Sequence, residues 1–427
     1  MDVIKIGFLG FGTVGSGASR ILASNTDSIA KKVGARVEIG GVLVRDKQKK
    51  RAYEIDPAIL TTDPNEIIES NDIDIIVEVM GGISPAREYV IRAMEKGKSI
   101  VTANKDMMAL HGKELFKAAD EHGVDLLFEG SVAGGIPIIR PLKHCLAANR
   151  LKEIIGIING TTNYMLTKMT AEGNDFGDVL KEAQLKGYAE ADPSSDIEGF
   201  DAARKLAILA SIAFNTRVTL DDVYVEGITK ISKEDIAYAR DLKYIIKLLG
   251  LAKDTDNGVE TRVHPCFIPE NHPLASVNDV YNAIFVKGDA VGDVMFFGRG
   301  AGDMPTGSAV VSDIMEAARN RVKNITGIHC TCYEEKTLKE IGDTESKYYL
   351  RLKVTDRPGV LASIAFALGD QNVSIASVLQ KHTYEDMAEI VLVTHLVREK
   401  NMQSALKIIE QLAAVREVCN IIRVEGD

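Results

Sequence analysis

The chain has 427 residues, enough for two or three domains, and 45% of its residues are hydrophobic while 26% are charged. A mean hydropathy of −0.01 is typical of an ordinary soluble protein. The net charge of −10 argues against a nucleic-acid partner. No apolar run reaches the roughly 18 residues that a membrane span needs, so we expect no membrane partner.

The number and spacing of the cysteines indicate the cellular compartment. The five cysteines are odd in number and scattered, which is typical of reduced thiols, and no secretion signal precedes the first strand at Val3. Cys330 and Cys332 form the one close pair. No His or Cys lies at ligand spacing from them, so the pair does not predict a zinc site. We therefore expect a cytoplasmic protein.

Strands and helices alternate through the first part of the chain. Apolar runs that suit buried strands, with helices between them, occur at 3–9, 37–44, 74–79, 99–101 and 126–128. This alternation predicts a parallel, doubly wound sheet of the Rossmann type. The alternation stops near Glu129, where a different region begins.

The middle of the chain has a less regular, α+β pattern. We expect a helix opened by Pro137, a strand over 154–158, a turn at Asn159-Gly160 and mixed structure up to about Arg299. A glycine- and proline-rich turn then precedes a helix over 308–322.

The pattern restarts after a polar linker at 333–346. Residues 348–427 read as strand, helix, two strands, helix and strand. This βαββαβ order is that of a ferredoxin-like fold. The sequence therefore predicts a separate C-terminal module.

A glycine-rich turn follows the first strand and opens a helix. In that context the GxGxxG pattern indicates a dinucleotide site, because glycines let the backbone approach a pyrophosphate at the helix N-terminus. The predicted cofactor contacts from this turn are Gly10, Phe11, Gly12, Thr13, Val14 and Gly15. A tight turn without a ligand is the structural alternative.

The end of the second strand bears on the choice of cofactor. An NAD enzyme would have an acidic residue there to bind the ribose hydroxyls. Here Arg45 ends the strand, and a guanidinium suits a 2′-phosphate. We expect NADP(H) to be preferred over NAD(H), although Asp46 follows directly.

The segment 200–214 reads as a helix so apolar that most of its surface must be buried. Asp201 and Lys205 lie one turn apart on one stripe of this helix. Ionised groups on a buried helix need partners because their desolvation is costly. We interpret the two as active-site residues; a plain salt bridge is the alternative.

Two loops carry further candidates. Thr102 and Lys105 belong to a loop after the strand at 99–101, at the sheet edge where ligands of open α/β sheets bind. The glycine-rich stretch 129–137 can turn several carbonyls inward near the Glu129 carboxylate, as in an oxygen-rich cation site. The alternative for Lys105 is a solvated loop lysine. The alternative for the stretch 129–137 is a plain corner between a strand and a helix.

Together these motifs resemble the homoserine dehydrogenase family over essentially the whole chain. The matching segments are GFGTVG at 10–15, TANK at 102–105, EGSVAGGIP at 129–137, NGTTNYML at 159–166, GYAEADP at 187–193 and DAARK at 201–205. The C-terminal module is similar to the amino-acid-sensing ACT domain.

The resemblance implies reversible, NAD(P)H-dependent reduction of L-aspartate 4-semialdehyde to L-homoserine, a step toward threonine, methionine and isoleucine. Lys205 is the expected proton donor, and Lys105 lies near substrate and nicotinamide. Glu190 and Asp201 match carboxylates that contact homoserine, and Gly187 lies against cofactor and substrate.

The resemblance also implies a monovalent-cation site for Na⁺ or K⁺, formed by Glu129 with the carbonyls of Val132, Gly134 and Ile136. It further implies that the turn containing Gly302 brings the chain back to the cofactor. The implied domains are an NADP-binding domain, a substrate and dimerisation domain, and an ACT domain; their bounds are 1–130 with about 305–325, 131–304 and 348–427.

The ACT module implies an amino-acid effector, with threonine expected, and a homodimer or homotetramer. Asp356 and Asn372 are placed to meet such a ligand, although both residue types also simply build turns. Two other functions stay open: a catalytically silent amino-acid sensor, and another semialdehyde oxidoreductase, which would need a nucleophilic cysteine.

Overall fold

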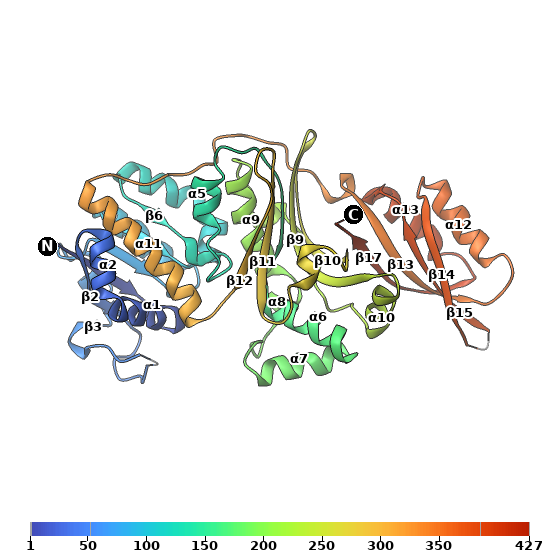
Figure 1. Ribbon diagram of the computed structural model, residues 1–427, viewed down its shortest axis with the longest axis horizontal. Coiled ribbons are helices and arrows are strands. Elements are labelled where there is room, and N and C mark those ends of the chain that lie inside the picture. Colours follow the sequence, from blue (N-terminus) through green and yellow to red (C-terminus); the bar gives the residue numbers. More distant parts are fainter. Residues whose placement is uncertain (1, 52, 385, 427) are drawn as a thin grey trace. The chain divides into compact units, whose positions relative to one another are not determined.

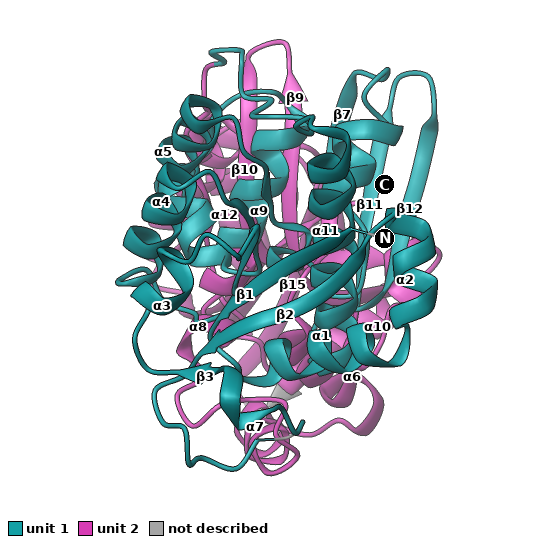
Figure 2. Ribbon diagram, turned by 90° about the vertical axis from the view of Figure 1, so that its left-hand side faces the viewer, with its two compact units in different colours: residues 1–154, 204–222, 282–336 teal, residues 155–203, 223–281, 337–427 magenta. Residues whose placement is uncertain are grey.

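The computed structural model describes residues 2–51, 53–384 and 386–426 (Figure 1). The chain divides into two compact units, which Figure 2 colours separately. Unit 1 comprises residues 1–154, 204–222 and 282–336, and unit 2 comprises residues 155–203, 223–281 and 337–427. Every helix within the described ranges is too short or too polar to cross a membrane.

Unit 1 contains a parallel sheet with the strand order β3-β2-β1-β4-β5-β6. This is the Rossmann order, so the predicted doubly wound sheet is confirmed. Its strands are β1 (Val3–Leu9), β2 (Arg36–Leu43), β3 (Leu60–Thr61), β4 (Ile75–Glu78), β5 (Ser99–Thr102) and β6 (Leu126–Leu127). β1, β4 and β5 are central in this order and largely buried, which explains their apolar sequences.

Helices pack on this sheet from two separate parts of the sequence. They are α1 (Thr13–Ser24), α2 (Thr26–Val33), α3 (Asn65–Ile68), α4 (Ala86–Glu95), α5 (Lys105–His122) and α11 (Asp303–Lys323). α11 begins five residues before the predicted 308, because Pro305 is tolerated in the first turn of a helix. It lies so close to α1 that a Cβ on Gly17 would come within 2.1 Å of the Asp303 carbonyl oxygen.

Four further elements belong wholly or mostly to unit 1. They are β7 (Leu151–Ile157), α9 (Phe200–Ala213), β11 (Tyr281–Gly288) and β12 (Gly292–Arg299), and the division falls inside β7, α9 and β11. The helix predicted from Pro137 begins only at Ile139 and ends in a π-helical turn at Pro141–Cys145. The predicted strand at 154–158 and the helix at 200–214 are confirmed.

Unit 2 combines helices with a long antiparallel hairpin. Its elements before the C-terminal module are α6 (Gly160–Glu172), α7 (Phe176–Leu185), α8 (Ser194–Ile197), β8 (Tyr224–Val225), α10 (Lys233–Asp241), β9 (Tyr244–Thr255) and β10 (Gly258–Pro269). The turn predicted at Asn159-Gly160 is wrong. Asn159 instead caps α6, its side-chain oxygen accepting a hydrogen bond from the Thr162 N–H at 2.9 Å.

The C-terminal part of unit 2 confirms the predicted ferredoxin-like module. It comprises β13 (Glu345–Thr355), α12 (Val360–Asp370), β14 (Ile375–Tyr384), β15 (Met387–Thr394), the short β16 (Val397–Arg398), α13 (Glu399–Ile409) and β17 (Val415–Val424). The strand order is β17-β13-β15-β14, and α12 and α13 lie side by side in Figure 1. Both helices cover the apolar core of the module.

The module continues the sheet of unit 2, because β17 pairs with β10 in parallel. Buried ion pairs cross this junction, which we call the β10 seam. Arg262 of β10 contacts Glu425 at 2.6 Å, and Arg351 of β13 contacts Asp235 of α10 at 2.8 Å. Arg423 of β17 contacts Glu226 at 3.0 Å. Removing one partner of such a pair would leave an uncompensated buried charge, so we expect single substitutions in the seam to be destabilising.

Candidate active site

The glycine-rich turn of unit 1 has the backbone geometry of a dinucleotide site. Gly10 has φ of 94°, and a Cβ there would lie 2.9 Å from the Met80 Cα, so the turn packs tightly against the end of β4. Gly12 precedes α1, and a Cβ there would meet nothing within 4 Å. The first glycine is thus needed for packing, and the second faces the open space that a pyrophosphate would use.

Arg45 and Asp46 lie just beyond the carboxyl end of β2, and both are exposed. The Asp46 carboxylate accepts a hydrogen bond from the Gln48 N–H at 2.8 Å. This carboxylate therefore stabilises its own loop, whereas the Arg45 guanidinium is exposed at the same edge of the sheet.

A buried hydrogen-bond network, which sequence reasoning missed, fixes the start of α5. The Glu78 carboxylate accepts from the Met80 N–H at 2.8 Å and from the Thr102 hydroxyl at 2.6 Å. Thr102 Oγ1 accepts from the Asn104 N–H at 3.0 Å, and Asn104 caps α5. Burial raises the pKa of Glu78, against the hydrogen bond from Thr102. Lys105, the first residue of α5, is thereby held at a fixed position.

The helices that carry the two candidate lysines are joined within unit 1. Arg204 of α9 forms an ion pair with Asp106 of α5 at 2.9 Å. Lys205 and Lys105 each neighbour one member of this pair in the chain, and both are half-buried. The ion pair therefore brings the backbone around the two lysines together, although sequence reasoning assigned no role to Arg204 or Asp106.

Two carboxylates of unit 2 accept hydrogen bonds from the side chain of Asn159. Its side-chain amide donates to Asp201 at 2.8 Å and to Asp196 at 2.7 Å. Asp201 is buried, and Asp196 was missed although it follows the GYAEADP segment. Asn159 thus caps α6 and holds two carboxylates close to one another.

The loop that carries Gly187 and Glu190 is exposed on unit 2. Gly187 has φ of 74°, a left-handed conformation that favours glycine. The Glu190 carbonyl accepts a hydrogen bond from the Gln184 side chain at 3.1 Å, which ties the loop to α7.

The predicted cation loop differs from the expectation in the role of its carboxylate. Glu129 is buried, and its carboxylate accepts from the N–H groups of Ile138, Ile139 and Arg140 at 2.6–2.8 Å. It thereby caps the helix at 139–145, which explains why this helix begins after Pro137.

The same loop turns sharply and is supported from α11. Ala133 and Gly134 have φ of 57° and 51°, and a Cβ on Gly134 would lie 2.4 Å from the Gly300 carbonyl. Buried Asp313 accepts from the Glu129 N–H at 2.8 Å and from Arg140 at 2.7 Å. Burial raises the pKa of Asp313 to about 8, while Arg140 lowers it. No cluster of three His, Cys, Asp or Glu side chains that could hold a metal occurs among the described residues.

The two polar positions singled out in the module differ in their local structure. Asn372 lies in a turn and has φ of 59°, a left-handed conformation that asparagine tolerates. Asp356 is exposed, and its N–H donates to the Asp386 carbonyl at 2.7 Å, which continues the pairing of β13 with β15. Turn formation therefore fits Asn372.

Comparison with known proteins covers the whole chain. The homoserine dehydrogenase family matches residues 137–315, its NAD-binding domain matches residues 10–129, and the ACT domain matches residues 348–414. The homoserine dehydrogenase of Synechocystis sp. is 46% identical over 99% of both chains.

Solved structures agree. The homoserine dehydrogenase from Thiobacillus denitrificans is 42% identical, covers 100% of this chain and 99% of its own, and has a TM-score of 0.94. A hyperthermophilic archaeal homoserine dehydrogenase in complex with NADPH is 26% identical, covers 77% of this chain and 99% of its own, and has a TM-score of 0.64. The chain therefore belongs to the homoserine dehydrogenase family of oxidoreductases and carries a C-terminal ACT domain.

Proposed function

We propose that this chain reduces L-aspartate 4-semialdehyde to L-homoserine, in the biosynthesis of threonine, methionine and isoleucine. The main support is the ion pair that joins the first turns of α5 and α9. Half-buried Lys105 comes directly after Asn104 in the chain, and half-buried Lys205 comes directly after Arg204. When bound, the nicotinamide supplies the hydride for the aldehyde carbon.

The lysines act on the aldehyde oxygen. Negative charge gathers on that oxygen in the transition state, and an ammonium group stabilises it and then donates a proton. We assign the proton donation to Lys205 and the positioning of substrate and nicotinamide to Lys105. The Glu78 network keeps the Lys105 backbone in place, so little reorganisation is needed during the reaction.

The substrate also carries an α-ammonium group, which requires carboxylates. We assign its binding to Glu190 and Asp201, with Gly187 close to cofactor and substrate. Asn159 supports this assignment because its amide orients the Asp201 carboxylate. Asp196 is a further candidate, since it accepts from the same amide at 2.7 Å.

We infer that NADPH is preferred over NADH. The Asp46 carboxylate is already hydrogen-bonded to Gln48, and exposed Arg45 suits a 2′-phosphate. Gly10 to Gly15 and Thr102 are the other proposed cofactor contacts in unit 1, with Gly302 before α11. The archaeal relative solved with NADPH supports this preference.

We also propose that a monovalent cation, Na⁺ or K⁺, binds the loop at 129–137. The proposed ligands are Glu129 and the carbonyl oxygens of Val132, Gly134 and Ile136. Three N–H donors hold the Glu129 carboxylate in place in this loop. Support comes from the left-handed turn, which reverses the backbone direction within a few residues.

For the ACT module we propose regulation by an amino acid, with threonine expected, in a cytoplasmic homodimer or homotetramer. Regulation requires that threonine bind the less active arrangement more tightly. Truncation is a poor test, since loss of Glu425 would leave Arg262 buried without its partner. Calorimetry with threonine on the full chain tests the assignment; no binding of any amino acid would contradict it.

The reaction itself is tested by following NADPH oxidation with aspartate semialdehyde. Turnover that is independent of phosphate is expected. A requirement for phosphate and NADP⁺ in the oxidative direction would instead indicate aspartate-semialdehyde dehydrogenase activity. No turnover with any semialdehyde would favour a silent sensor.

A further inference from the structure

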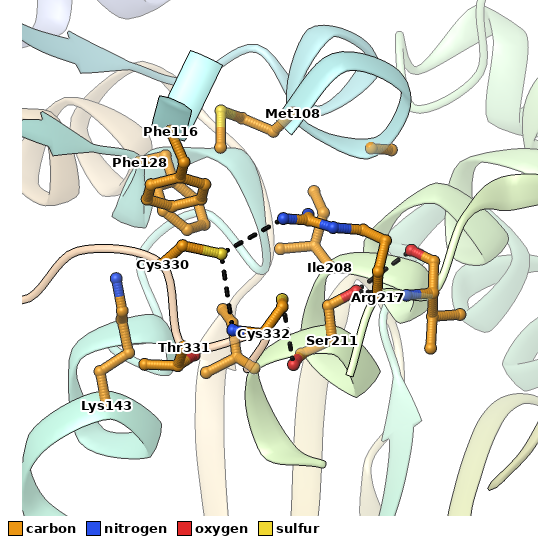
Figure 3. A pocket seen from close by; sticks show the side chains of 13 residues that line it. Met108, Phe116, Phe128, Lys143, Ile208, Ser211, Arg217, Cys330, Thr331 and Cys332 are labelled. Carbon is orange, nitrogen blue, oxygen red and sulfur yellow. Dashed lines mark hydrogen bonds between the residues drawn. The ribbon is translucent and has the colours of Figure 1, made fainter. Parts of the chain in front are cut away.

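Two cysteines that the proposed reaction does not use lie together in a charged pocket of unit 1 (Figure 3). Cys330 and Cys332 follow α11 and are both partly exposed. The Arg217 guanidinium donates to the Cys330 sulfur at 3.3 Å, and the Cys332 N–H donates to it at 3.5 Å. These donors stabilise a thiolate at Cys330.

A second cation lies on the same pocket. Lys143 is buried, with its ammonium 5.2 Å from the ring centre of Phe116, and it donates to the Ile328 carbonyl at 3.0 Å. The hydrogen bond from Cys332, with further help from Arg217 and Lys143, lowers the pKa of Cys330. Burial has the opposite effect on this pKa but is outweighed. Thiolates rather than thiols react with peroxides.

The pocket admits a small reagent. Its inner cavity has a volume of about 20 Å³, which is room for one or two water-sized molecules. Cys330 and Cys332 also line an outer groove of about 330 Å³, together with Arg217 and Lys113. Hydrogen peroxide fits such a site, and its approach from the groove is open.

The spacing of the two cysteines allows a bridge. Residues two apart have Cα atoms at most about 7 Å apart. The usual Cα separation in disulfides extends to about 6.8 Å. Closure of the bridge therefore requires the segment at 330–332 to adjust, so that the Cys332 sulfur, which donates to the Ser211 carbonyl in the reduced state, turns toward Cys330.

We propose that Cys330 and Cys332 form a peroxide-sensitive dithiol that closes to an intramolecular disulfide and lowers turnover. The Cys330 thiolate attacks one oxygen of hydrogen peroxide, and with one proton this gives a sulfenic acid and water. The Cys332 thiol then attacks the Cys330 sulfur and releases a second water. One peroxide is reduced, two sulfurs are oxidised, and a thiol reductant reverses the change.

The consequence for turnover rests on the proposed roles of Lys105 and Lys205. The cavity is lined by Met108 of α5 and Ser211 of α9, the helices that carry those lysines. In the reduced state the Cys332 thiol donates to the Ser211 carbonyl at 3.6 Å. A disulfide removes this donor.

A disulfide also removes the thiolate that faces Arg217. The Nε atom of Arg217 is already buried and makes no hydrogen bond to any described residue. A Cβ on Gly112 of α5 would lie 3.2 Å from the guanidinium, so there is little space between them. Movement of the uncompensated guanidinium would therefore press on α5.

The test uses the full-length protein with equimolar hydrogen peroxide, followed by thiol alkylation and peptide mass spectrometry. We expect a Cys330–Cys332 bridge, two hydrogens lighter, while Cys145 stays alkylated. Exposed Cys145 is the internal control, and Cys330 should react about tenfold faster because the Arg217 guanidinium and the Cys332 N–H stabilise its thiolate. Equal rates at the two cysteines, or no bridge, would overturn the proposal.

Two variants separate the steps. Cys332→Ser should accumulate a sulfenic acid on Cys330 that dimedone traps, and Cys330→Ser should leave Cys332 unreactive toward peroxide. Turnover of the oxidised wild type should fall and recover with dithiothreitol, and a bridged enzyme with unchanged turnover would refute the regulatory part. The thiol chemistry is measured without substrate, so its failure is distinct from failure of the proposed reaction.

Discussion

The start of α5 in unit 1 and the β10 seam in unit 2 both bury charged groups, but in different settings. At α5, Glu78 accepts hydrogen bonds from a backbone N–H and a hydroxyl, and half-buried Lys105 follows Asn104. Along the seam, buried Arg351 contacts Asp235 at 2.8 Å and Glu389 at 2.9 Å. The first setting fixes the backbone beside a half-buried lysine, whereas the second buries an arginine between two carboxylates.

This difference indicates which residues serve chemistry and which serve stability. A cation enclosed by carboxylates is neutralised and cannot approach a substrate. A half-buried cation on a fixed backbone can reach one. We therefore expect substitutions in the two regions to change different measured quantities.

The largest effect is expected at Lys105. Lys105→Ala should lower kcat by on the order of 10²–10⁴, the range for loss of a group that acts in the transition state. Circular dichroism and Tm should stay close to wild type. Lys113→Ala, an exposed lysine on the same helix, is the matched control and should keep its kcat. A kcat near wild type for Lys105→Ala would remove Lys105 from the site.

A large change in stability is expected at Asp235. Asp235→Ala removes the buried carboxylate that accepts hydrogen bonds from Arg351 and Tyr349, which should lower the free energy of unfolding by about 3–5 kcal/mol. Denaturant unfolding measures this change. Glu234→Ala, its exposed neighbour, should change little. If the two variants unfolded alike, the seam would not stabilise the unit.

A smaller effect is expected at the cofactor edge. Arg45→Ala should raise KM for NADPH about tenfold or more, because it removes a charge-assisted hydrogen bond. KM for NADH should stay within about twofold, because NADH has no 2′-phosphate for such a bond to act on. Steady-state kinetics with both cofactors decide the point, and equal effects on both would mean that Arg45 does not meet the 2′-phosphate.

The pH dependence of the free energy of unfolding should reveal the protonation of Lys247. This lysine is buried and donates to the Val277 carbonyl at 2.6 Å, and burial lowers its pKa from 10.5 to about 8. Its folded pKa lies below its unfolded pKa, so its charge opposes folding below pH 8 and does so less as the pH rises toward 10.5. Lys247→Met should flatten the pH profile of the free energy of unfolding over that window. An unchanged profile would contradict this reading.

The smallest effect is expected for the cation loop. Turnover should rise a few-fold when Na⁺ or K⁺ replaces a bulky organic cation at constant ionic strength. The reason is that an ion held by carbonyls would stiffen the loop at 129–137. Rates that stay flat across the titration would count against the site.

Much of the fold could be predicted from apolar periodicity. The strand at 3–9, the helix at 200–214 and the βαββαβ module follow from local patterns, which is why the structure agrees with them. The start of α11 was misjudged because Pro305 reads as a helix breaker although a first turn tolerates it.

The site was predicted less completely because its supporting contacts join distant parts of the sequence. Glu78 bonds Thr102, and Arg204 bonds Asp106, across separations that no local pattern reveals. A signal did exist for Glu78, which follows three apolar residues at the end of β4, where a buried carboxylate needs partners. Asp196 had no such signal, since serine- and aspartate-rich segments usually form turns.

The most direct test measures kcat and the free energy of unfolding together for Lys205→Met and Arg351→Met. We predict that Lys205→Met loses on the order of 10²–10⁴ in kcat with little change in stability. Arg351→Met should lose several kcal/mol of stability while each folded molecule keeps its kcat. Near wild-type kcat in Lys205→Met, or a comparable loss of kcat in folded Arg351→Met, would contradict the division between catalytic and stabilising charges.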